Sequence, residues 1–362
     1  MDGSYNPDNG DFPLIKGDQS IWWVFNDNSG IHGLTHAAAI QIEVQAMAYA
    51  FASDSNEDLN NATFYDFNMT NKATDELRDA FVGLWVDFDL GCGDDDFLGY
   101  DEEFQMMYVY NKDDYDGDEE DGCYSTAYGN NIPILGIKKI DGNKVTSHLT
   151  INRDDSVGYT PMDPQSDAEF YNNLKGLWKD GTPITYGGSG FHPMSTDSTK
   201  FLFSGDPSNE NEWSMCTSDL PFDDRRSLMS SAMPDLQPGQ STTASYAVIY
   251  VNDIEYPCPS LDRLKDAADA VCEAVLSSSE ELVSKVNFTV SPNPATDMIT
   301  ITSKNSIQTI NLINVNGQNL LTDNSGLSKV KILDVSSLPA SIYFISIKDD
   351  QGNVAIEKLV KN

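Results

Sequence analysis

The chain carries little positive charge. Lysine and arginine together number 22, against 57 aspartates and glutamates, so the formal net charge is −35. A surface of this sign repels the phosphates of nucleic acids and the headgroups of anionic lipids, which excludes a nucleic acid partner. The same surface attracts divalent cations and cationic partners, so the clusters of acidic residues are candidate ion sites.

Long hydrophobic runs are also missing. No apolar stretch approaches the roughly 18 residues that a membrane-spanning helix needs. We therefore predict no membrane span.

Cysteine is scarce and odd in number. The five cysteines are Cys92, Cys123, Cys216, Cys258 and Cys272, and none forms a C-x-x-C pair, so a zinc ribbon is not expected. Disulfides between Cys92 and Cys123 and between Cys216 and Cys258 would suit an oxidising compartment. Buried free thiols are the alternative, because spacing alone does not determine connectivity.

Charge and length divide the chain. Residues 287–362 hold six lysines and six acidic residues, so the entire −35 falls on the preceding part. A length of 362 residues favours two domains. We predict an acidic domain at 1–276, a linker at 277–286 around the sequence SSSEELVSK, and a second domain at 287–362.

The acidic part is patterned mainly for β-structure. Residues 38–53 alternate with period two, with Ile40, Ile42 and Val44 on one face, whereas a helix would place apolar residues three and four apart. Further strand-like runs occupy 61–73, 80–90, 104–111, 132–140, 145–151 and 245–251, and Asn/Asp/Gly clusters separate them. The pattern predicts an all-β fold: a large antiparallel β-sandwich with long loops at 152–240 and one C-terminal helix that begins after Ser260.

The strongest chemical signal is an acidic segment that reads DFDLGCGDDDFLGYD, residues 87–101. Ca²⁺ binds six to eight oxygen atoms, and carboxylates and carbonyls of a glycine-containing loop supply them. We predict a calcium site whose ligands are Asp87, Asp89, Asp94, Asp95, Asp96 and Asp101. The EF-hand pattern is absent, and a solvated acidic loop is the alternative. A second acidic cluster, residues 111–121, is predicted to be solvated, because like charges at this density repel, and a weak ion site is the alternative.

No catalytic motif is complete. His32 and His36 have zincin spacing, but Gly33 stands where the glutamate base is required, and the glycines around Ser189 do not form a nucleophile elbow. A triad assembled in space stays open. Among the tryptophans, Trp178 is the best candidate for an exposed surface that stacks on sugars.

The last seventy-odd residues carry the most specific pattern. Strand-like alternations are separated by SPNPATD, by NVNGQNLL with an Asn-Gly hairpin signal, by LPASIYFI and by the basic end KLVKN. This pattern resembles the type A C-terminal sorting domain of the Bacteroidetes type IX secretion system. The residues that carry the resemblance are Pro292, Asn293, Pro294, Gly317, Leu338, Pro339, Tyr343 and Lys358.

The resemblance implies a small Ig-like β-sandwich that the type IX secretion machinery handles. It places the protein outside the cell, either secreted or on the outer-membrane surface. An ordinary C-terminal β-sandwich module is the alternative. A sorting tail is an address and not an activity.

The acidic part is similar, around LWVDFDLG and LKGLWKDGTPITYGG, to uncharacterised β-rich modules of large exported proteins. This similarity implies that the protein is exported, but it implies no activity. The polar start MDGSYNPDNGDF shows no signal peptide, although type IX export begins in the periplasm, so we expect Met1 not to be the natural start.

The sequence therefore predicts an exported or cell-surface protein. Its main domain would be a non-catalytic binding or structural β-sandwich, stabilised by calcium, with a carbohydrate or a surface protein as ligand. The alternative is a secreted hydrolase that acts on polysaccharide or protein.

Overall fold

The computed structural model describes residues 16–362 except 31, 36, 118–126, 142, 154–159, 219, 222, 283–287, 315–318 and 351–353. The chain divides into two compact units, one at Lys16–Cys272 and one that contains Glu273–Asn362. The predicted fold class is confirmed: the chain is mostly β, in antiparallel sheets.

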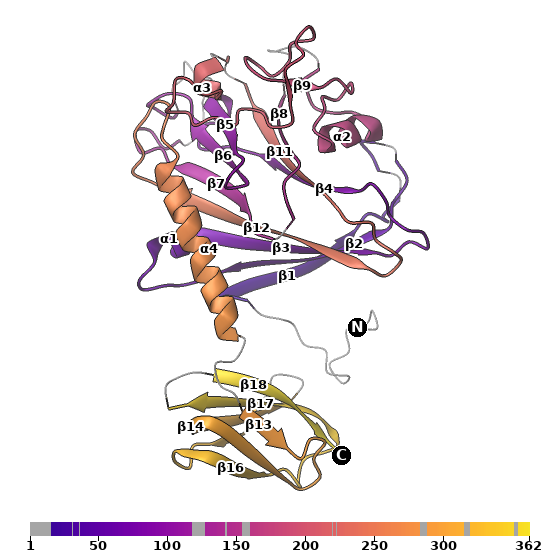
Figure 1. Cartoon of the computed structure of the whole chain (residues 1–362), viewed down its shortest axis with the longest axis vertical. Coiled ribbons are helices and arrows are strands. Elements are labelled where there is room, and N and C mark those ends of the chain that lie inside the picture. Colours follow the sequence, from indigo (N-terminus) through magenta and orange to yellow (C-terminus); the bar gives the residue numbers. More distant parts are fainter. Residues whose placement is uncertain are drawn as a thin grey trace. The chain divides into compact units, whose positions relative to one another are not determined.

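A seven-stranded antiparallel sheet forms the base of the first unit, with strand order β1-β2-β3-β12-β7-β6-β5 (Figure 1). Its strands are β1 (Gln19–Asn26), β2 (Ile42–Ala50), β3 (Ala62–Asn71), β12 (Ser241–Val251), β7 (Ile134–Lys139), β6 (Met106–Asn111) and β5 (Asp96–Asp101).

A three-stranded sheet, in the order β4-β11-β8, lies over the β5 end of the larger sheet (Figure 1). Its strands are β4 (Phe81–Asp87), β11 (Arg225–Ala232) and β8 (Ser147–Asn152), and a short pair, β9 (Ile184–Thr185) and β10 (Ser198–Thr199), stands apart. The side chains of Met107 and Leu149, which are fully buried, belong to the core of this unit.

Most of the predicted strands form where the sequence placed them: β2 follows the alternating run, and β3 and β6 follow β-branched and aromatic runs. The prediction was wrong for residues 96–101, which it assigned to a flexible loop. This segment is strand β5, because Phe97, Leu98 and Tyr100 are all buried in the core. Burial of these three apolar side chains outweighs the local turn chemistry of the preceding glycines and aspartates.

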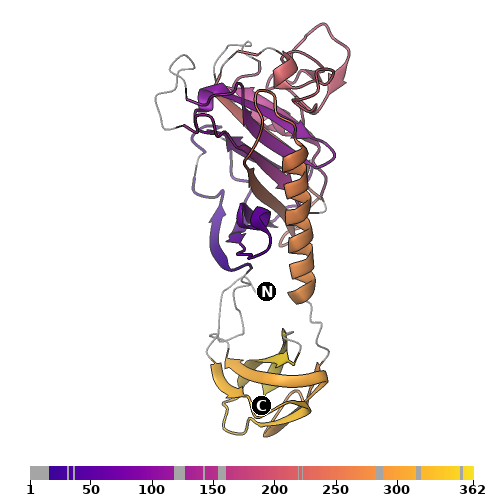
Figure 2. The same cartoon turned by 90° about the vertical axis from the view of Figure 1, so that its left-hand side faces the viewer.

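The predicted helix is α4 (Asp262–Leu282), which begins where the Ser260 hydroxyl accepts the backbone N–H of Asp262 (3.2 Å). Leu261, Leu264, Ala267, Ala268 and Val271 are buried at helical spacing. The helix lies along the larger sheet (Figure 2), where a Cβ on Gly136 of β7 would lie 3.0 Å from Leu264. It includes residues 277–282, which the sequence analysis assigned to the linker.

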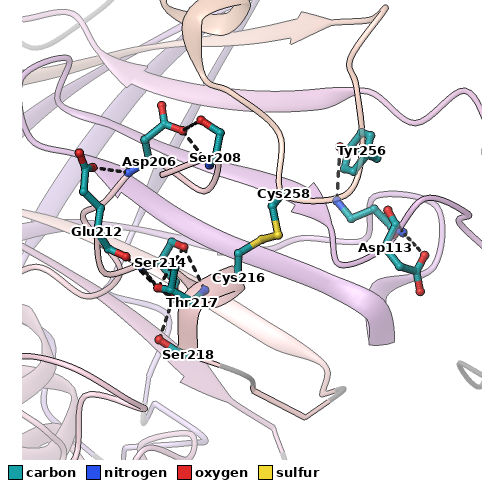
Figure 3. Close-up of a disulfide and its surroundings, with 11 residues drawn as sticks. Asp113, Asp206, Ser208, Glu212, Ser214, Cys216, Thr217, Ser218, Tyr256 and Cys258 are labelled. Atoms are coloured by element: carbon teal, nitrogen blue, oxygen red, sulfur yellow. Dashed lines mark hydrogen bonds between the residues drawn. A yellow bond between two sulfur atoms is a disulfide. The ribbon is translucent and has the colours of Figure 1, made fainter. Parts of the chain in front are cut away.

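Three shorter helices are α1 (Glu57–Asn60), α2 (Asp167–Leu174) and α3 (Met215–Ser218). A disulfide joins Cys216 in α3 to Cys258, just before α4, with 5.8 Å between the Cα atoms (Figure 3). This confirms one predicted pair. The other predicted pair includes Cys123, which lies outside the described residues, and Cys272 is a free thiol.

The second unit is a small β-sandwich. Its strands are β13 (Phe288–Ser291), β14 (Met298–Asn314), β15 (Asn319–Asp323), β16 (Ser328–Asp334), β17 (Ser341–Asp349) and β18 (Val354–Lys361). The long strand β14 serves both layers, because its first part pairs with β13 and β16 and its second part with β15 and β17. The core between them is apolar and includes Ile299, Ile310 and Ile345.

Candidate functional site

The six predicted calcium ligands do not converge on one point. Asp87, Asp89 and Asp94 are exposed, and Asp87 forms an ion pair with Arg226 (3.1 Å between Oδ1 and Nε). Asp101 ends strand β5, five residues after Asp96, so about 16 Å of strand separates the two. It pairs with Lys265 of α4 at 2.9 Å and does not share a site with the loop.

Asp95 and Asp96 are the two predicted ligands that lie in the interior, at 0 % and 1 % exposure. The Oδ2 atom of Asp96 accepts the backbone N–H of Leu90 (2.8 Å), which draws the loop over the start of β5. Burial raises the pKa of Asp96 well above its usual value, and the neighbouring charges of Asp95 and Asp116 raise it further.

The sequence analysis missed two residues of this region. Asn111 and Asp116 lie in the cluster that was predicted to be solvated, yet they are 0 % and 1 % exposed. Asp116 accepts the backbone N–H of Cys92 at Oδ1 (2.9 Å) and that of Tyr128 at Oδ2 (2.5 Å). The only sequence signal was the presence of two acidic clusters about twenty residues apart, which strand pairing brings together.

Two glycines make room for these carboxylates. A Cβ on Gly91 would lie 1.9 Å from Oδ2 of Asp116, and a Cβ on Gly93 would lie 2.2 Å from Oδ1 of Asp89. Gly91 also has φ +77, a conformation that favours glycine. The acidic loop therefore needs glycine at these two positions, because the carboxylates of Asp116 and Asp89 lie where a side chain would be.

Within the residues that the structure describes, no three histidine, cysteine, aspartate or glutamate side chains gather closely enough to hold a metal ion. A site here would depend on a mixture of carboxylate and neutral oxygen atoms.

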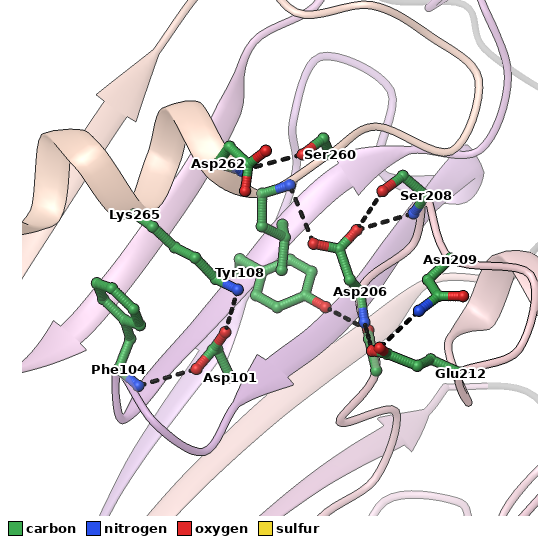
Figure 4. Close-up of polar contacts among 12 residues, drawn as sticks. Asp101, Phe104, Tyr108, Asp206, Ser208, Asn209, Glu212, Ser260, Asp262 and Lys265 are labelled. Carbon is green, nitrogen blue, oxygen red and sulfur yellow. Dashed lines mark hydrogen bonds and ion pairs between the residues drawn. The ribbon is translucent and has the colours of Figure 1, made fainter.

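A polar cavity of about 330 Å³ lies on another side of this unit, between strand β5, the 204–212 loop and the start of α4 (Figure 4). Four carboxylates line it: Asp101, Asp206, Glu212 and Asp262. Lys265 is the one cation of the lining, and the other polar lining residues are Tyr100, Ser204, Ser208, Asn209 and Ser260.

Hydrogen bonds hold the walls of this cavity in place. Asp206 accepts the N–H and the hydroxyl of Ser208 at Oδ1 (2.9 and 2.6 Å) and the N–H of Leu261 at Oδ2 (3.4 Å). Glu212 accepts from Nδ2 of Asn209 (2.7 Å) and from the N–H of Asp206 (2.8 Å). The loop is thus tied both to itself and to α4, and the cavity is preformed.

A histidine–serine contact lies in the core. Nε2 of His148 is 2.7 Å from Oγ of Ser227, and Nδ1 contacts the carbonyl of Leu202 at 3.1 Å. His148 and Ser227 are both fully buried, so a substrate has no access to the serine. A catalytic triad also needs a carboxylate on the second ring nitrogen, and here that nitrogen contacts the carbonyl of Leu202. Burial lowers the pKa of His148 to about 4, so the ring is neutral at pH 7.

The prediction for Trp178 was wrong. Its side chain is 1 % exposed and donates from Nε1 to the carbonyl of Gly190 (3.1 Å), so it supports a loop from inside. The exposed tryptophan is Trp22 of edge strand β1, at 55 %. Arg225 is structural, with hydrogen bonds to the carbonyls of Asp96, Pro221 and Asp223.

The residues of the sorting pattern meet in space. Asn293 donates from Nδ2 to the carbonyl of Lys358 (2.6 Å), and its Oδ1 accepts the N–H of Val360 (2.9 Å). Tyr343 pairs with Leu359 across β17 and β18, and its hydroxyl donates to the carbonyl of Pro339 (2.9 Å). Pro292 and Pro294 flank Asn293, and Leu338 packs against the core. Gly317 lies outside the described residues.

The fold and this cluster define the C-terminal unit as an export module. Residues 289–362 match the family of secretion system C-terminal sorting domains. The resemblance inferred from the sequence is thereby confirmed: the chain is an exported protein of the type IX system, destined for secretion and for attachment to or release from the cell surface. None of the helices that the structure describes has the length and apolar character to cross a membrane.

Similarity to other proteins is weak. The chain resembles a polysaccharide lyase at 10% identity and a TM-score of 0.23, over 88% of this chain and 34% of the lyase, so it spans about a third of that protein. It also resembles the CBM51-2 and INT domains of ZmpB from Clostridium perfringens at 8% identity and a TM-score of 0.16, over 87% and 92% of the two chains. At these scores neither resemblance bears on activity. A comparison with curated proteins finds no match.

Proposed function

We propose that the acidic domain, residues 1–276, is a non-catalytic binding module, stabilised by calcium and delivered outside the cell by the sorting domain at 287–362. The observation that carries the binding role is the preformed polar cavity beside α4. Its volume lies near the lower end of small-molecule sites, which span roughly 300–1,000 Å³. Its lining suits one compact polar ligand.

The chemistry of the lining favours a carbohydrate. Carboxylates and amides accept and donate hydrogen bonds to hydroxyl groups, and the cavity presents four carboxylates, an asparagine amide and Lys265. The excess of negative charge disfavours anionic ligands. A neutral saccharide, or one that carries an amino group, meets both conditions.

Titration calorimetry with neutral and amino oligosaccharides tests this role. The informative variant is Asp262→Asn, because Asp262 is exposed at the cavity and no described hydrogen bond ends on its carboxylate. The matched control is Asp269→Asn, an exposed aspartate further along the same helix. We expect at least a fivefold loss of affinity for the first variant and none for the second. Equal affinities for both variants, or no saccharide binding at all, would reject the cavity as the ligand site.

A hydrolase is the second candidate, because glycosidases use a pair of carboxyl groups as their catalytic residues and this cavity contains several. Prolonged incubation of the same oligosaccharides with the protein, followed by mass spectrometry, separates the two functions. Binding without new reducing ends supports the binding module. Cleavage that Asp262→Asn or Glu212→Gln abolishes would replace it with the hydrolase.

Calcium is proposed as the stabilising ion because carboxylates crowd residues 87–116 and three of them, Asp95, Asp96 and Asp116, are buried. Bound Ca²⁺ would contribute about 2.7 kcal/mol of stability when its free concentration is a hundred times the dissociation constant. The melting temperature of the acidic unit should therefore fall when a chelator replaces calcium at low salt. Identical melting curves would remove calcium from the proposal.

The address is tested by fusing residues 287–362 behind a signal peptide and a reporter in a host that has the type IX system. We expect the reporter outside the cell. Retention in the periplasm would show that these residues are not sufficient.

A further inference from the structure

Two buried polar side chains stand opposite each other where β5 begins and β6 ends. Asp96 and Asn111 are register partners, at 1 % and 0 % exposure. The N–H of Lys112 donates to the carbonyl of Asp95 (3.0 Å), so Asp96 and Asn111 occupy a non-hydrogen-bonded position of the ladder. Side chains on the same face come closest at such positions.

Each of these side chains keeps one oxygen atom without a hydrogen-bond donor. Oδ2 of Asp96 accepts the N–H of Leu90, but Oδ1 accepts nothing. Nδ2 of Asn111 donates to Asp113 (3.2 Å), but Oδ1 of Asn111 accepts nothing. A buried acceptor without a partner is costly, and two facing acceptors cannot satisfy each other while the Asp96 carboxyl is ionised.

The surroundings are rich in negative charge and poor in donors. The charges of Asp95 and Asp116 both act on Asp96. The buried cation Arg225 donates to the carbonyl of Asp96, and no described hydrogen bond joins it to the carboxylate. Asp116 is held in place by two backbone N–H groups, and each of its oxygens keeps a second lone pair.

We propose that a calcium ion binds between the β5–β6 hairpin and the 87–96 loop, with Oδ1 of Asp96, Oδ1 of Asn111 and the carboxylate of Asp116 as its side-chain ligands. This inference rests on the calcium stabilisation proposed above and replaces most of the predicted ligands. Asp87, which is bound to Arg226, and Asp101, at the far end of β5, are not part of the site.

The oxygen types select calcium over other metals. A mixed set of carboxylate and amide oxygens, completed by carbonyls or water, matches the coordination of Ca²⁺. Zinc and other transition metals prefer imidazole or thiolate, and no such group belongs to this set. Gly91 allows Asp116 to approach, because any side chain there would occupy the space of its carboxylate.

The test measures Ca²⁺ binding to the chelator-stripped full chain by calorimetry, together with the calcium-dependent shift in melting temperature. Asp96→Asn removes the central charge, and we expect at least a tenfold loss of affinity. Asn111→Asp adds a charge at the proposed ligand, and we expect at least a tenfold gain in affinity although the calcium-free protein melts lower. A gain of affinity in a destabilised protein does not follow from a purely structural role.

The matched control is Asn71→Asp, which introduces the same change at another fully buried asparagine. Oδ1 of Asn71 accepts the N–H of Ala73 (2.9 Å), and its Nδ2 group donates to two carbonyls, so it has no vacant acceptor. We expect it to lower stability without changing calcium affinity.

The outcomes separate this site from the broader proposal. A wild-type protein that does not respond to calcium removes calcium stabilisation altogether, and this site with it. A different result would overturn this site alone: wild type binds calcium, and neither Asn111→Asp nor Asn71→Asp changes the affinity. Calcium would then bind elsewhere. If Asp96→Asn does not fold, the Asn111→Asp result decides.

Discussion

At the residue scale, Gly91 shows how a single missing side chain permits the acidic loop. Gly91→Ala would force a Cβ into the carboxylate of Asp116 and would also hold alanine at φ +77. The matched control is Gly239→Ala, at φ +80 with nothing within 4 Å. Both variants lose about 1–2 kcal/mol to backbone strain. We expect Gly91→Ala to lose at least about 2 kcal/mol more, because the carboxylate must also move.

Urea unfolding of the two variants provides the measurement. Equal losses at the two positions would mean that Asp116 moves aside freely, and that its close approach to Gly91 has no energetic weight.

His148 makes a second prediction at this scale, on pH. Its pKa is about 4 in the folded protein and about 6.5 when unfolded, so between these values only the unfolded state binds the proton. The contribution of His148 to stability is therefore present above pH 6.5 and is lost as pH falls to 4. The loss is about 1.4 kcal/mol per pH unit at most, or about 3 kcal/mol in total.

The check is the free energy of unfolding of wild type and of His148→Gln between pH 7 and pH 4. The variant should be less stable at pH 7, because two hydrogen bonds change, but its stability should fall less steeply with pH. The exposed His192 supplies the control, since His192→Gln should keep the wild-type slope. Parallel slopes for all three proteins would contradict a neutral, buried His148.

At the element scale, the disulfide between α3 and the segment before α4 closes a loop across 42 residues. In the chain-entropy account, a loop of this length contributes about 4 kcal/mol, and measured values commonly reach about 2–4 kcal/mol. The double variant Cys216→Ser, Cys258→Ser should lose stability in this range in urea unfolding. Cys272→Ser should change it little, since that thiol is free. A double variant as stable as wild type would show that the Asp206 hydrogen bonds hold the loop unaided.

The elements also show what the sequence could reveal. The alternating run at 38–53 predicted β2, and β-branched and aromatic runs predicted β3 and β6. Strand β5 was missed because three aspartates precede its apolar residues and resemble a turn. Strand β11 was missed because its interior contains Ser227, Ser230 and Ser231, all of which are buried. In these strands tertiary burial overrides the local pattern.

The candidate sites were harder to predict than the strands. Composition identified the right acidic segment and the right ion class to test, but not which carboxylates lie inside. Asn111 and Asp116 join Asp96 only through strand pairing and the loop at Cys92, and local sequence contains neither relation. The cavity was missed for the same reason, since its carboxylates come from three separate segments.

At the scale of the whole molecule, the acidic unit carries the entire net charge and the C-terminal tail is neutral. In the tail, Asn293 holds the last strand, β18, through two hydrogen bonds. Asn293→Ala removes both hydrogen bonds to β18, at a cost of about 1–3 kcal/mol. We expect faster amide hydrogen exchange in β18 of the full-length protein. Asn324→Ala, at an exposed turn position, should leave that exchange unchanged. Unaltered protection of β18 in both variants would show that Asn293 does not hold the last strand.

The clustering of the sorting residues has a consequence for quality control. Asn293, the Pro339–Tyr343 segment and Lys358 lie apart in the sequence and meet only when β17 and β18 are paired and the turn before β14 is closed. If the export machinery recognises this cluster, it recognises a folded tail, and a collapsed or truncated tail would not display the cluster. Export that depends on this folded cluster would act as a quality check, because a chain with a misfolded tail would not be recognised and would not be exported.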